Sequence, residues 1–496
     1  MTGSRRVRNR LFPPGSWLNT FICSFRYAVT IIRQDGLAYF FKRFFQFTSW
    51  KIGTFYQSIH SKTAANESSR LYKVDDIQVN SQLSPDLSPG TLPSYQDLQY
   101  LEQLSTTAIR DYRDNLVMQG ISSHNQYISE RRTLLRQGHE GYSNRRILFV
   151  SPIRVLGGGA NLIFLAANSM RRMGVDAQIM NLNVHRSWFE RNYPNLSIPV
   201  VFVDIEDIPR LALNYDAVIA TSNPTVSWIT PAVAERPSLV NGYYIQDYEP
   251  YFYSPDSHEF HKANASYTLI PNQIRMVTTP WISDQIERHH HVQSHIIGGH
   301  MDTDLFIPRS HTDPSWPDRP LRIVAMIRPA TARRNPKMTM AILQQASNMY
   351  QSRLEIILFG CDHTDPGFAS LEKDFSWQIA GQLLSTQIAH LFNEADIFVD
   401  YSDFQAFGLT ALESMASGLA VIVPAHGGTN VYAKHEENCL VVDTHDQTPS
   451  FHALQRLIED DELRLKLQHN AVSTAAQFFP ELPAFNMLKV LFPEDK

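Results

Sequence analysis

Short apolar runs alternate with amphipathic segments twice along this chain of 496 residues, and this alternation limits the possible folds more than any other feature. The first series begins near Arg146, and the second begins at Leu321 after a proline-rich stretch from Pro308 to Pro320. Strands that alternate with helices form parallel sheets covered on both faces. The sequence therefore predicts an α/β fold with two doubly wound, Rossmann-like domains, which bind ligands at the carboxyl ends of their strands.

The predicted strands are apolar runs bounded by polar or glycine-containing turns. They lie at 147–150, 177–180, 200–203, 217–220, 239–245 and 296–297 in the first series, and at 321–327, 354–359, 397–399, 420–423 and 440–442 in the second. Five parts follow from this pattern: an extension at 1–62, a linker and helical region at 63–145, domains at 146–307 and 308–475, and a tail at 476–496.

The extension at 1–62 differs from the rest in charge, because it holds ten Lys and Arg residues against a single acid, Asp35. Large aromatic residues are interleaved with these charges, from Tyr39 to Tyr56. Basic residues with aromatic neighbours at helical spacing suit an anionic membrane surface. A helical hairpin packed on the rest of the protein, with a solvated basic face, is the equally weighted alternative.

Charge and cysteine content exclude several classes of protein. The net charge of −5 gives no general case for a nucleic-acid partner. Cys23, Cys361 and Cys439 are far apart and form no C-x-x-C pair, which favours a reducing cytosolic compartment over a disulfide scaffold. No uncharged run has the length and continuity of a membrane span. We therefore expect a cytoplasmic protein, peripheral on the inner face of the membrane if 1–62 is an anchor.

Two loops that follow predicted strands carry groups suited to phosphate. Gly157–Gly159 stands between the first strand and a helix, where backbone amides and the helix dipole favour an anion; a turn without a ligand is the alternative. Arg328, Arg333, Arg334 and Lys337 cluster after the strand at 321–327. A diphosphate would balance these cations; a solvated loop with surface arginines is the less favoured alternative.

A third segment, from Asp403 to Gly418, is the most specific. Gly408 opens a predicted helix, and Glu413 lies about one turn into it between apolar neighbours. A first-turn acid is more often a solvated one that the helix dipole favours. The buried strand that follows at 420–423 favours instead a Glu413 that is hydrogen bonded.

Together these motifs resemble the nucleotide-sugar-binding half of the GT4 family of retaining glycosyltransferases, which have the GT-B fold. The resemblance covers about 146–475 and rests on Arg328, Arg333, Phe407-Gly408-Leu409, Leu412-Glu413, Met415-Ala416, Gly418, Val421-Ile422, Gly427-Gly428-Thr429, Asn438–Val442 and the linker Asp302–Pro308. The first glutamate of the family motif is Gln405 here, and the usual second cation, Lys, is Arg333. Gln405 keeps hydrogen-bonding groups but no charge, so the sugar preference is open.

The resemblance implies transfer of a sugar from a nucleotide-diphosphate donor to a hydroxyl of a glycan or lipid-linked acceptor, with retention and without a metal or other cofactor. By this resemblance, 146–307 is the acceptor-side domain and 308–475 is the donor domain. The tail at 476–496 is expected to pack against the first domain. Donor binding is expected at Gly158, Gly159, Arg328, Arg333, Gln405, Phe407, Gly408, Leu409, Thr410 and Glu413.

The segment Tyr244–Pro250 narrows the resemblance to bacterial rhamnosyltransferase-like enzymes of surface-polysaccharide synthesis. Asp247 and Glu249, at the end of a strand, are candidates to hold an acceptor hydroxyl or to support positive charge at the anomeric carbon; a turn role for Asp247 is nearly equal. His289–His291 lacks an acid cluster, so no metal is expected there. A nucleotide-sugar epimerase and a non-catalytic nucleotide-sugar-binding scaffold remain the alternative functions.

Overall fold

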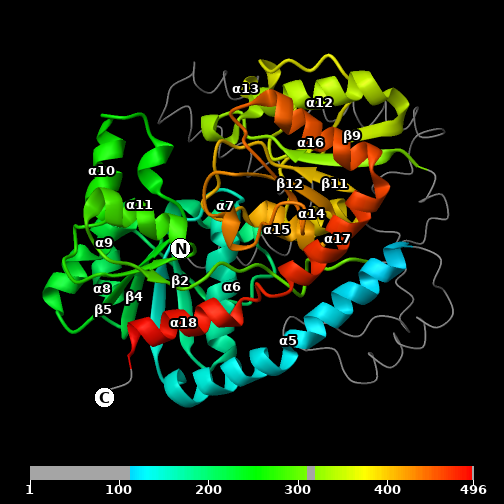
Figure 1. The fold of residues 1–496 in the computed structure, drawn as a ribbon. Helices are drawn as coiled ribbons and strands as arrows, with labels where there is room; N and C mark the ends of the chain where they lie inside the picture. Colours follow the sequence, from blue (N-terminus) through cyan, green and yellow to red (C-terminus); the bar gives the residue numbers. More distant parts are fainter. Residues whose placement is uncertain (1–111, 310–318, 494–496) are drawn as a thin grey trace, which may run out of the picture. The chain divides into compact units, whose positions relative to one another are not determined.

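The computed structural model describes residues 112–309 and 319–493. The predicted extension at 1–62, the linker after it and the end of the tail therefore lie outside the described residues. Two parallel sheets, each covered by helices, form the centre of the two halves of the described chain (Figure 1). The first has seven strands in the order β3-β2-β1-β4-β5-β6-β7, and the second has six in the order β10-β9-β8-β11-β12-β13. The two doubly wound domains predicted from the sequence are present.

The strand bounds follow the apolar runs closely. The first sheet contains β1 (Arg146–Val150), β2 (Asp176–Leu182), β3 (Val200–Val203), β4 (Ala217–Ala220), β5 (Val240–Ile245), β6 (Ile274–Val277) and β7 (His295–Ile296). The second contains β8 (Leu321–Met326), β9 (Leu354–Phe359), β10 (Gln378–Ile379), β11 (Ile397–Val399), β12 (Ala420–Pro424) and β13 (Leu440–Val442).

Two strands were missed by the sequence pattern, each for a physical reason. β6 carries a charged residue, Arg275, whose guanidinium is buried and donates hydrogen bonds to the carbonyls of Tyr267, Gln273 and Ile270. These bonds replace the water that a buried guanidinium loses. β10 has only two residues, too few for an apolar run.

Helices cover both faces of each sheet, because alternate side chains of a strand point into opposite layers. In β1, Ile147 and Phe149 pack in the layer of α6 (Gly158–Arg172), whereas Leu148 packs in the layer of α9 (Asn223–Glu235). The other α-helices that follow β1 are α7 (Arg186–Asn192), α8 (Ile208–Ala212), α10 (His258–Ser266), α11 (Pro280–His290), α12 (Pro336–Tyr350), α13 (Pro366–Ala369), α14 (Ser385–Asn393), α15 (Leu409–Ala416), α16 (Gln447–Glu459), α17 (Asp461–Ala475) and α18 (Glu481–Leu491).

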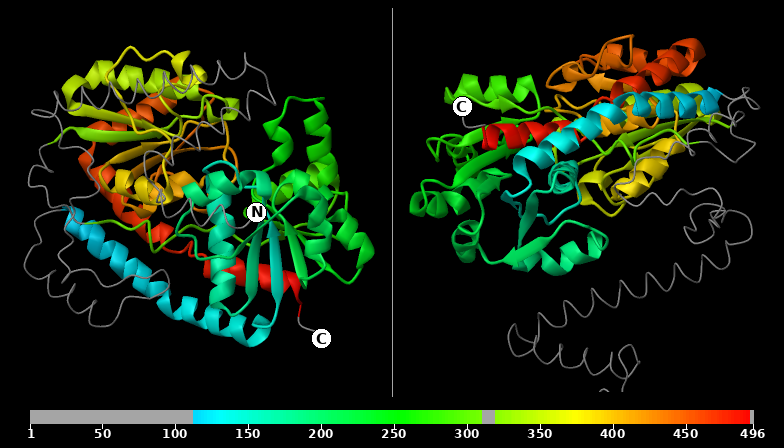
Figure 2. Two further views of the ribbon diagram at one scale, coloured as in Figure 1. Left: turned by 180° about the vertical axis from the view of Figure 1, so that it is seen from behind. Right: turned by 90° about the horizontal axis from the view of Figure 1, so that it is seen from below.

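A long helix, α5 (Tyr112–Tyr142), runs beside both halves of the described chain (Figures 1 and 2). It packs on α17 of the second half and on α6 and α18 of the first. The last helix, α18, lies against α6 and the first sheet, although it follows the second in sequence. Two elements thus join the halves: a long helix from before the first sheet and a short one from after the second.

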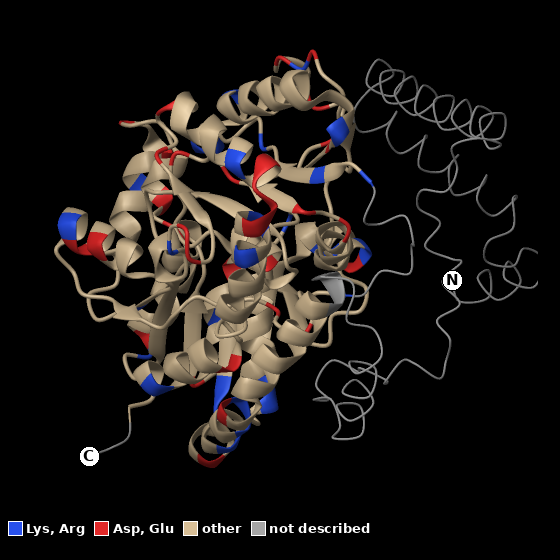
Figure 3. Ribbon diagram, turned by 45° about the vertical axis from the view of Figure 1, so that its right-hand side comes forward, with Lys and Arg blue, Asp and Glu red and all other residues tan. Residues whose placement is uncertain are grey.

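Both sheets reverse their strand order at a pair of central strands, β1 beside β4 and β8 beside β11. Ligands of such sheets bind outside the carboxyl ends of the strands at this point. The glycine loop follows β1 and the arginine loop follows β8, so topology places both at the expected position. Lys, Arg, Asp and Glu are interspersed over the ribbon in the view of Figure 3. None of the helices in 112–309 and 319–493 is long and apolar enough to cross a membrane.

Candidate functional site

A cavity of about 600 Å³ lies between the carboxyl edges of the two sheets. Five segments line it: the loop from β1 into α6, the turn after β4, the turn after β5, the loop after β8, and the stretch that leads into α15. Predicted residues from both halves meet here. They are Gly158, Gly159, Asp247, Arg328, Arg333, Gln405, Phe407, Gly408, Leu409 and Thr410.

The glycine loop brings backbone close to the opposite half. α6 begins at Gly158 after an extended Gly157 that caps it with no side chain. A Cβ added at Gly158 would lie 2.9 Å from Leu409 Cδ2, and one at Gly159 would lie 3.1 Å from Gln246 Oε1. Larger residues would therefore require the side chains of Leu409 and Gln246 to move. The first turn of α6 directs N–H groups toward the cavity, where they favour an anion.

Arg333 and Asp247, predicted separately for the two domains, form an ion pair across the cavity. Arg333 Nη2 lies 2.7 Å from Asp247 Oδ2, and both side chains are about 15% exposed. Asp247 Oδ1 also accepts from the N–H of Tyr248. The other two nitrogens of Arg333, Nε and Nη1, are buried and have no hydrogen-bond partner among the described residues. Two donors of this guanidinium are thus left for a ligand or for water.

Aromatic rings hold the Arg333 guanidinium in place. Its Cζ lies 5.1 Å from the ring centre of Phe252 and 5.2 Å from that of Phe404. Such rings attract a cation by their quadrupole. Phe252 is 48% exposed at the end of the short 3₁₀ helix Glu249–Phe252, which gives the first half an apolar side chain at this cavity. The sequence analysis gave neither ring a role: Phe252 lies outside every motif, and Phe404 lies within the Asp403–Gly418 segment without being named as a site residue.

Arg328 and Arg334 also line the cavity, and within 112–309 and 319–493 no hydrogen bond or ion pair is found for either guanidinium. Burial lowers the pKa of Arg328, and burial followed by the neighbouring cations lowers that of Arg334 despite Asp400 and Asp247. Both pKa values are lowered because a buried guanidinium loses its hydration, and no hydrogen-bonded carboxylate among the described residues replaces it. Arg334 was predicted only as one cation of a cluster; here it faces the cavity with Arg328, while Lys337 is exposed on α12.

Gln405 is 4% exposed, and its side-chain amide is already engaged. Nε2 donates to Asp400 Oδ2 at 2.5 Å and lies 3.2 Å from Ser402 Oγ. A glutamate here would set two carboxylates in contact, which disfavours the ionised form of one of them. The amide thus satisfies Asp400, a role the sequence pattern did not indicate.

The stretch that follows Gln405 leads the chain into α15. Gly408 has φ +81°, and a Cβ there would lie 2.9 Å from Thr429 Cγ2, so only glycine fits without strain. Phe407 is 4% exposed and its ring packs edge-on against Tyr432 with centroids 5.8 Å apart. Phe407 therefore contributes to the core as well as to the cavity wall.

Glu413 lies deeper than expected. It is 5% exposed on α15 and is not among the residues that line the cavity. Burial, and then the charge of Asp302, raises the pKa of Glu413 well above its usual range. The structure shows no hydrogen bond for its carboxylate among the described residues, so the bonded role expected from its apolar setting is not seen.

Glu249 lines the same cavity as Asp247, but its carboxylate is already hydrogen bonded. It accepts from the backbone N–H and the side-chain amide of Asn223 and from the hydroxyl of Tyr243 at 2.6–2.8 Å. Burial nevertheless raises its pKa. Both acids predicted for the acceptor side therefore lie at the cavity, and Glu249 is the one bound to neighbouring groups of its own half.

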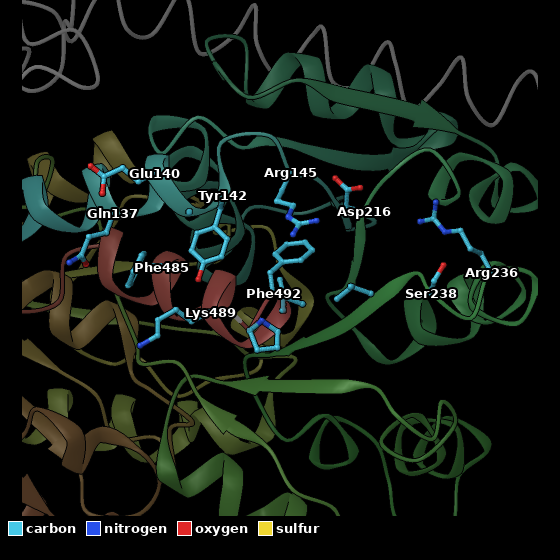
Figure 4. A pocket seen from close by; sticks show the side chains of 14 residues that line it. Gln137, Glu140, Tyr142, Arg145, Asp216, Arg236, Ser238, Phe485, Lys489 and Phe492 are labelled. Carbon is cyan, nitrogen blue, oxygen red and sulfur yellow. The ribbon is translucent and has the colours of Figure 1, made fainter. Parts of the chain in front are cut away.

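A larger cavity, of about 970 Å³, lies elsewhere, by the beginnings of β1, β4 and β5 (Figure 4). Arg145 stacks on Phe492 there, with the guanidinium carbon 4.6 Å from the ring centre. None of the predicted site residues lines this cavity. Size alone therefore does not single out the candidate site, whereas the cluster of arginines at the smaller cavity is where the predicted residues meet.

Similarity to solved structures defines the fold class. A sucrose-phosphate synthase from Thermosynechococcus elongatus aligns over 69% of this chain and 97% of its own, with a TM-score of 0.56 and 17% identity. HepE of Anabaena, crystallised with UDP-glucose, aligns over 70% and 98% with a TM-score of 0.56 and 16% identity. The described residues have the GT-B fold of such glycosyltransferases.

Sequence similarity then identifies part of the chain. Residues 371–474 match the family model of glycosyl transferases group 1. A D-inositol 3-phosphate glycosyltransferase of Corynebacterium glutamicum is 34% identical over 93 residues, which are 19% of this chain and 22% of that protein. The chain thus matches about a fifth of the length of that curated relative. The likeness to glycosyl transferases group 1 is thus shown for residues 371–474, within the second half.

Proposed function

We propose that the protein transfers a sugar from a nucleotide-diphosphate donor to a hydroxyl acceptor, with retention of the anomeric configuration. The observation that carries this proposal is the convergence of Arg328, Arg334 and the first turn of α6 on one cavity. Unpaired guanidiniums and backbone N–H groups together suit a diphosphate, which offers several acceptor oxygens and negative charge. The group 1 domain and the UDP-glucose of HepE support a nucleotide sugar as its source.

The difficult step is departure of the nucleoside diphosphate, whose charge grows as the bond to the sugar breaks. Groups aimed at that growing charge lower the barrier without reorganising. Arg328 and Arg334 lie where they can do this, and Arg333 adds two nitrogens, Nε and Nη1, that have no hydrogen-bond partner among the described residues. The proposed reaction takes its stabilising charge from these side chains and needs no metal ion. A donor oxygen is the proposed acceptor of the proton that the attacking hydroxyl releases.

The acceptor is proposed to enter from the first half. Asp247 and Phe252 lie there on the cavity wall, and Phe252 is 48% exposed. Gln246 Oε1 is buried and has no hydrogen-bond partner among the residues that the structure describes. An acceptor hydroxyl could donate to Gln246 or Asp247, and an apolar ring suits the face of a sugar. We propose a glycan or lipid-linked acceptor. A rhamnosyl or other deoxyhexosyl donor, in surface-polysaccharide synthesis, is the finer proposal.

The test combines binding and turnover on the full chain. Thermal shift and calorimetry with UDP, ADP, GDP, dTDP and their sugars, in EDTA, should identify one nucleotide; a ligand at 100 Kd stabilises by about 2.7 kcal/mol. The matched variants are Arg328→Ala, Arg334→Ala and, as control, Arg353→Ala, an exposed arginine beside Tyr350. Only the first two should lose affinity. Equal affinity in all three variants, or no binding by any nucleotide, would overturn the proposal.

Product analysis separates the alternatives. Transfer to an added acceptor supports the proposal, and proton coupling constants of the product report retention or inversion. A nucleotide sugar that returns isomerised without any acceptor would indicate an epimerase. Binding without chemistry, at every acceptor tried, would indicate the scaffold. Dependence of transfer on added magnesium would contradict the metal-independent step.

A further inference from the structure

His426, Asp443 and His445 come together at the carboxyl edge of the second sheet. His426 stands two residues beyond Pro424, the end of β12, and Asp443 stands one residue beyond Val442, the end of β13. Pro424 and Val442 are partners in the parallel ladder, and the N–H of Ala425 donates to the carbonyl of Val442 at 2.8 Å. The ladder therefore fixes the two loops side by side before any ligand binds.

The three side chains have the spacing of metal ligands. His445 Nδ1 lies 2.9 Å and His426 Nε2 lies 3.7 Å from Asp443 Oδ1, and all three atoms lie within 4.8 Å of one another. Ligand atoms about 2.0–2.1 Å from a tetrahedral Zn²⁺ are about 3.3 Å apart. The observed distances fall on both sides of this value, so small side-chain rotations would complete the geometry.

Hydrogen bonding within the loop explains only part of this arrangement. Asp443 Oδ1 accepts from the backbone N–H of His445 and pairs with its ring, as in an ordinary polar turn. His426 is held there by the strand ladder and by a ring contact rather than by a hydrogen bond to the carboxylate. Its Nε2, at 3.7 Å, is too far from the carboxylate for a hydrogen bond, and its ring packs edge-on against that of His445, with the ring centroids 5.0 Å apart.

The loops that carry the ligands are anchored to the rest of the second half. Thr444, between two of the ligands, donates its hydroxyl to the carbonyl of Ser402 at 2.8 Å. The carbonyl of His426 accepts from the N–H of Gln405, and Gly428 N–H donates to the carbonyl of Gln405 at 2.7 Å. A preorganised site loses less conformational freedom on binding than a floppy one. The loop that carries His426 is also hydrogen bonded to the loop that carries Gln405.

We propose that His426, Asp443 and His445 bind one divalent transition-metal ion, with Zn²⁺ as the preferred class. Two imidazoles and a carboxylate suit zinc and its neighbours rather than calcium or magnesium, which prefer oxygen ligands. The three side chains are 56–60% exposed, so an ion can enter and a fourth position stays open to water. The ion would join the loops after β12 and β13.

This site differs from the histidine run that the sequence first suggests. In that run, His290 Nε2 is 3.0 Å from the hydroxyl of Tyr248, and the ring of His289 stacks on the same tyrosine. Those histidines are used in packing. His426 and His445, in contrast, are separated by eighteen intervening residues and only the β12–β13 pairing unites them.

The experiment is metal titration of the full chain, freed of any purification tag and of metal. Calorimetry with ZnCl₂ should show a site that disappears in His426→Ala, in Asp443→Asn and in His445→Ala, each weakening affinity at least about tenfold. The control is His452→Ala, an exposed histidine of α16 with no acid cluster. Co²⁺ should give visible absorption in the wild type and the control only, and Zn²⁺ should raise the Tm of both.

Three outcomes would overturn the proposal: no zinc affinity in the wild type, affinity retained in all three variants, or equal loss in His452→Ala. Circular dichroism of the variants separates loss of a ligand from loss of the fold. Nucleotide binding in EDTA is measured on the same variants. Because the metal proposal and the proposed function rest on different residues, nucleotide binding by a chain without zinc affinity would refute only the metal site.

Discussion

Arg131 and Arg333 both reach a carboxylate from another part of the chain, yet only one of them has all its hydrogen bonds. Arg131, on α5 and 1% exposed, makes two bonds to Glu481 and two to Asp304, all between 2.9 and 3.1 Å. Within the part of the chain that the structure describes, Arg333 makes one such bond, to Asp247, and two of its buried nitrogens have no partner. The hydrogen-bond donors of Arg131 are therefore all used, whereas some of those of Arg333 are not.

The difference separates a role in the fold from a role in binding. Burial opposes the charge of Arg131, but the bonds and charges of Asp304 and Glu481 outweigh it, so its pKa is raised. These acids stand on the linker between the sheets and at the start of α18, so Arg131 ties three segments together. Around Arg333, the pKa values of Arg328 and Arg334 are instead lowered, with burial as the main cause. This cost of burying a charge is what the proposed diphosphate would offset.

The largest expected effect comes from breaking the saturated cluster. Arg131→Met should lower the free energy of unfolding by about 3–5 kcal/mol, because it leaves a buried carboxylate without its main partner. Glu481 is fully buried and would keep only Arg172. Urea denaturation measures the loss. The double variant Arg131→Met/Glu481→Leu should recover part of it; a single variant within 1 kcal/mol of wild type would show that the cluster is dispensable.

The unpaired arginines should behave in the opposite way. Arg328→Ala and Arg334→Ala should each weaken nucleoside-diphosphate binding by about 1.5–3 kcal/mol, the usual value of a charge-assisted hydrogen bond. Stability without ligand should stay the same or rise, since each variant removes an uncompensated charge. Calorimetry and urea denaturation on the same samples give both quantities. Destabilisation without loss of affinity would place these residues with Arg131.

Glu413 extends the comparison of paired and unpaired buried charges to a carboxyl group. Because burial and Asp302 raise its pKa, the folded state keeps a proton that the unfolded chain releases above about pH 4.5. Stability is therefore lost as pH rises from the unfolded toward the folded pKa. Glu413→Gln cannot ionise, so it should be more stable than wild type by about 1–3 kcal/mol at pH 8 and less so at pH 5.

The same variant examines the family role of Glu413. A ribose contact requires that Glu413→Gln also weaken binding of the nucleoside diphosphate, with or without its sugar. Denaturation at two pH values and calorimetry at one settle both points. A stability gain that does not change with pH would contradict the raised pKa, and unchanged affinity would remove Glu413 from the donor site.

The smallest effect should come from the ion pair in the cavity. Asp247→Asn removes a negative charge beside the proposed diphosphate, so affinity for it should rise about threefold to tenfold, or by up to about 1.4 kcal/mol. Transfer to the acceptor should fall, because Asp247 is proposed to face the acceptor hydroxyl. Glu235→Gln, at the end of α9, is the control. Weaker nucleotide binding in Asp247→Asn would mean that the pair positions Arg333 and does not compete for it.

Much of the fold could be predicted from the sequence, because its strands are buried on both faces and read as continuous apolar runs. β4, Ala217–Ala220, and β9, Leu354–Phe359, were placed to the residue. β6 was missed where Arg275 interrupts the run. The cavity residues Arg328, Arg333 and Gly158 could be named in advance because anion-binding groups follow strand ends at known topological positions.

The partners of these residues could not be read from the sequence. That Asp247 would neutralise Arg333, 86 positions away, depends on how the two sheets face each other. That Gln405 would satisfy Asp400, and that His426 would meet Asp443, depends on loops set by ladder register. Local patterns determined the strands, the helices and the cluster of cations, because those follow from residues near one another. Which cations stay unpaired was decided by tertiary structure alone, since a counter-charge acts through space and not along the chain.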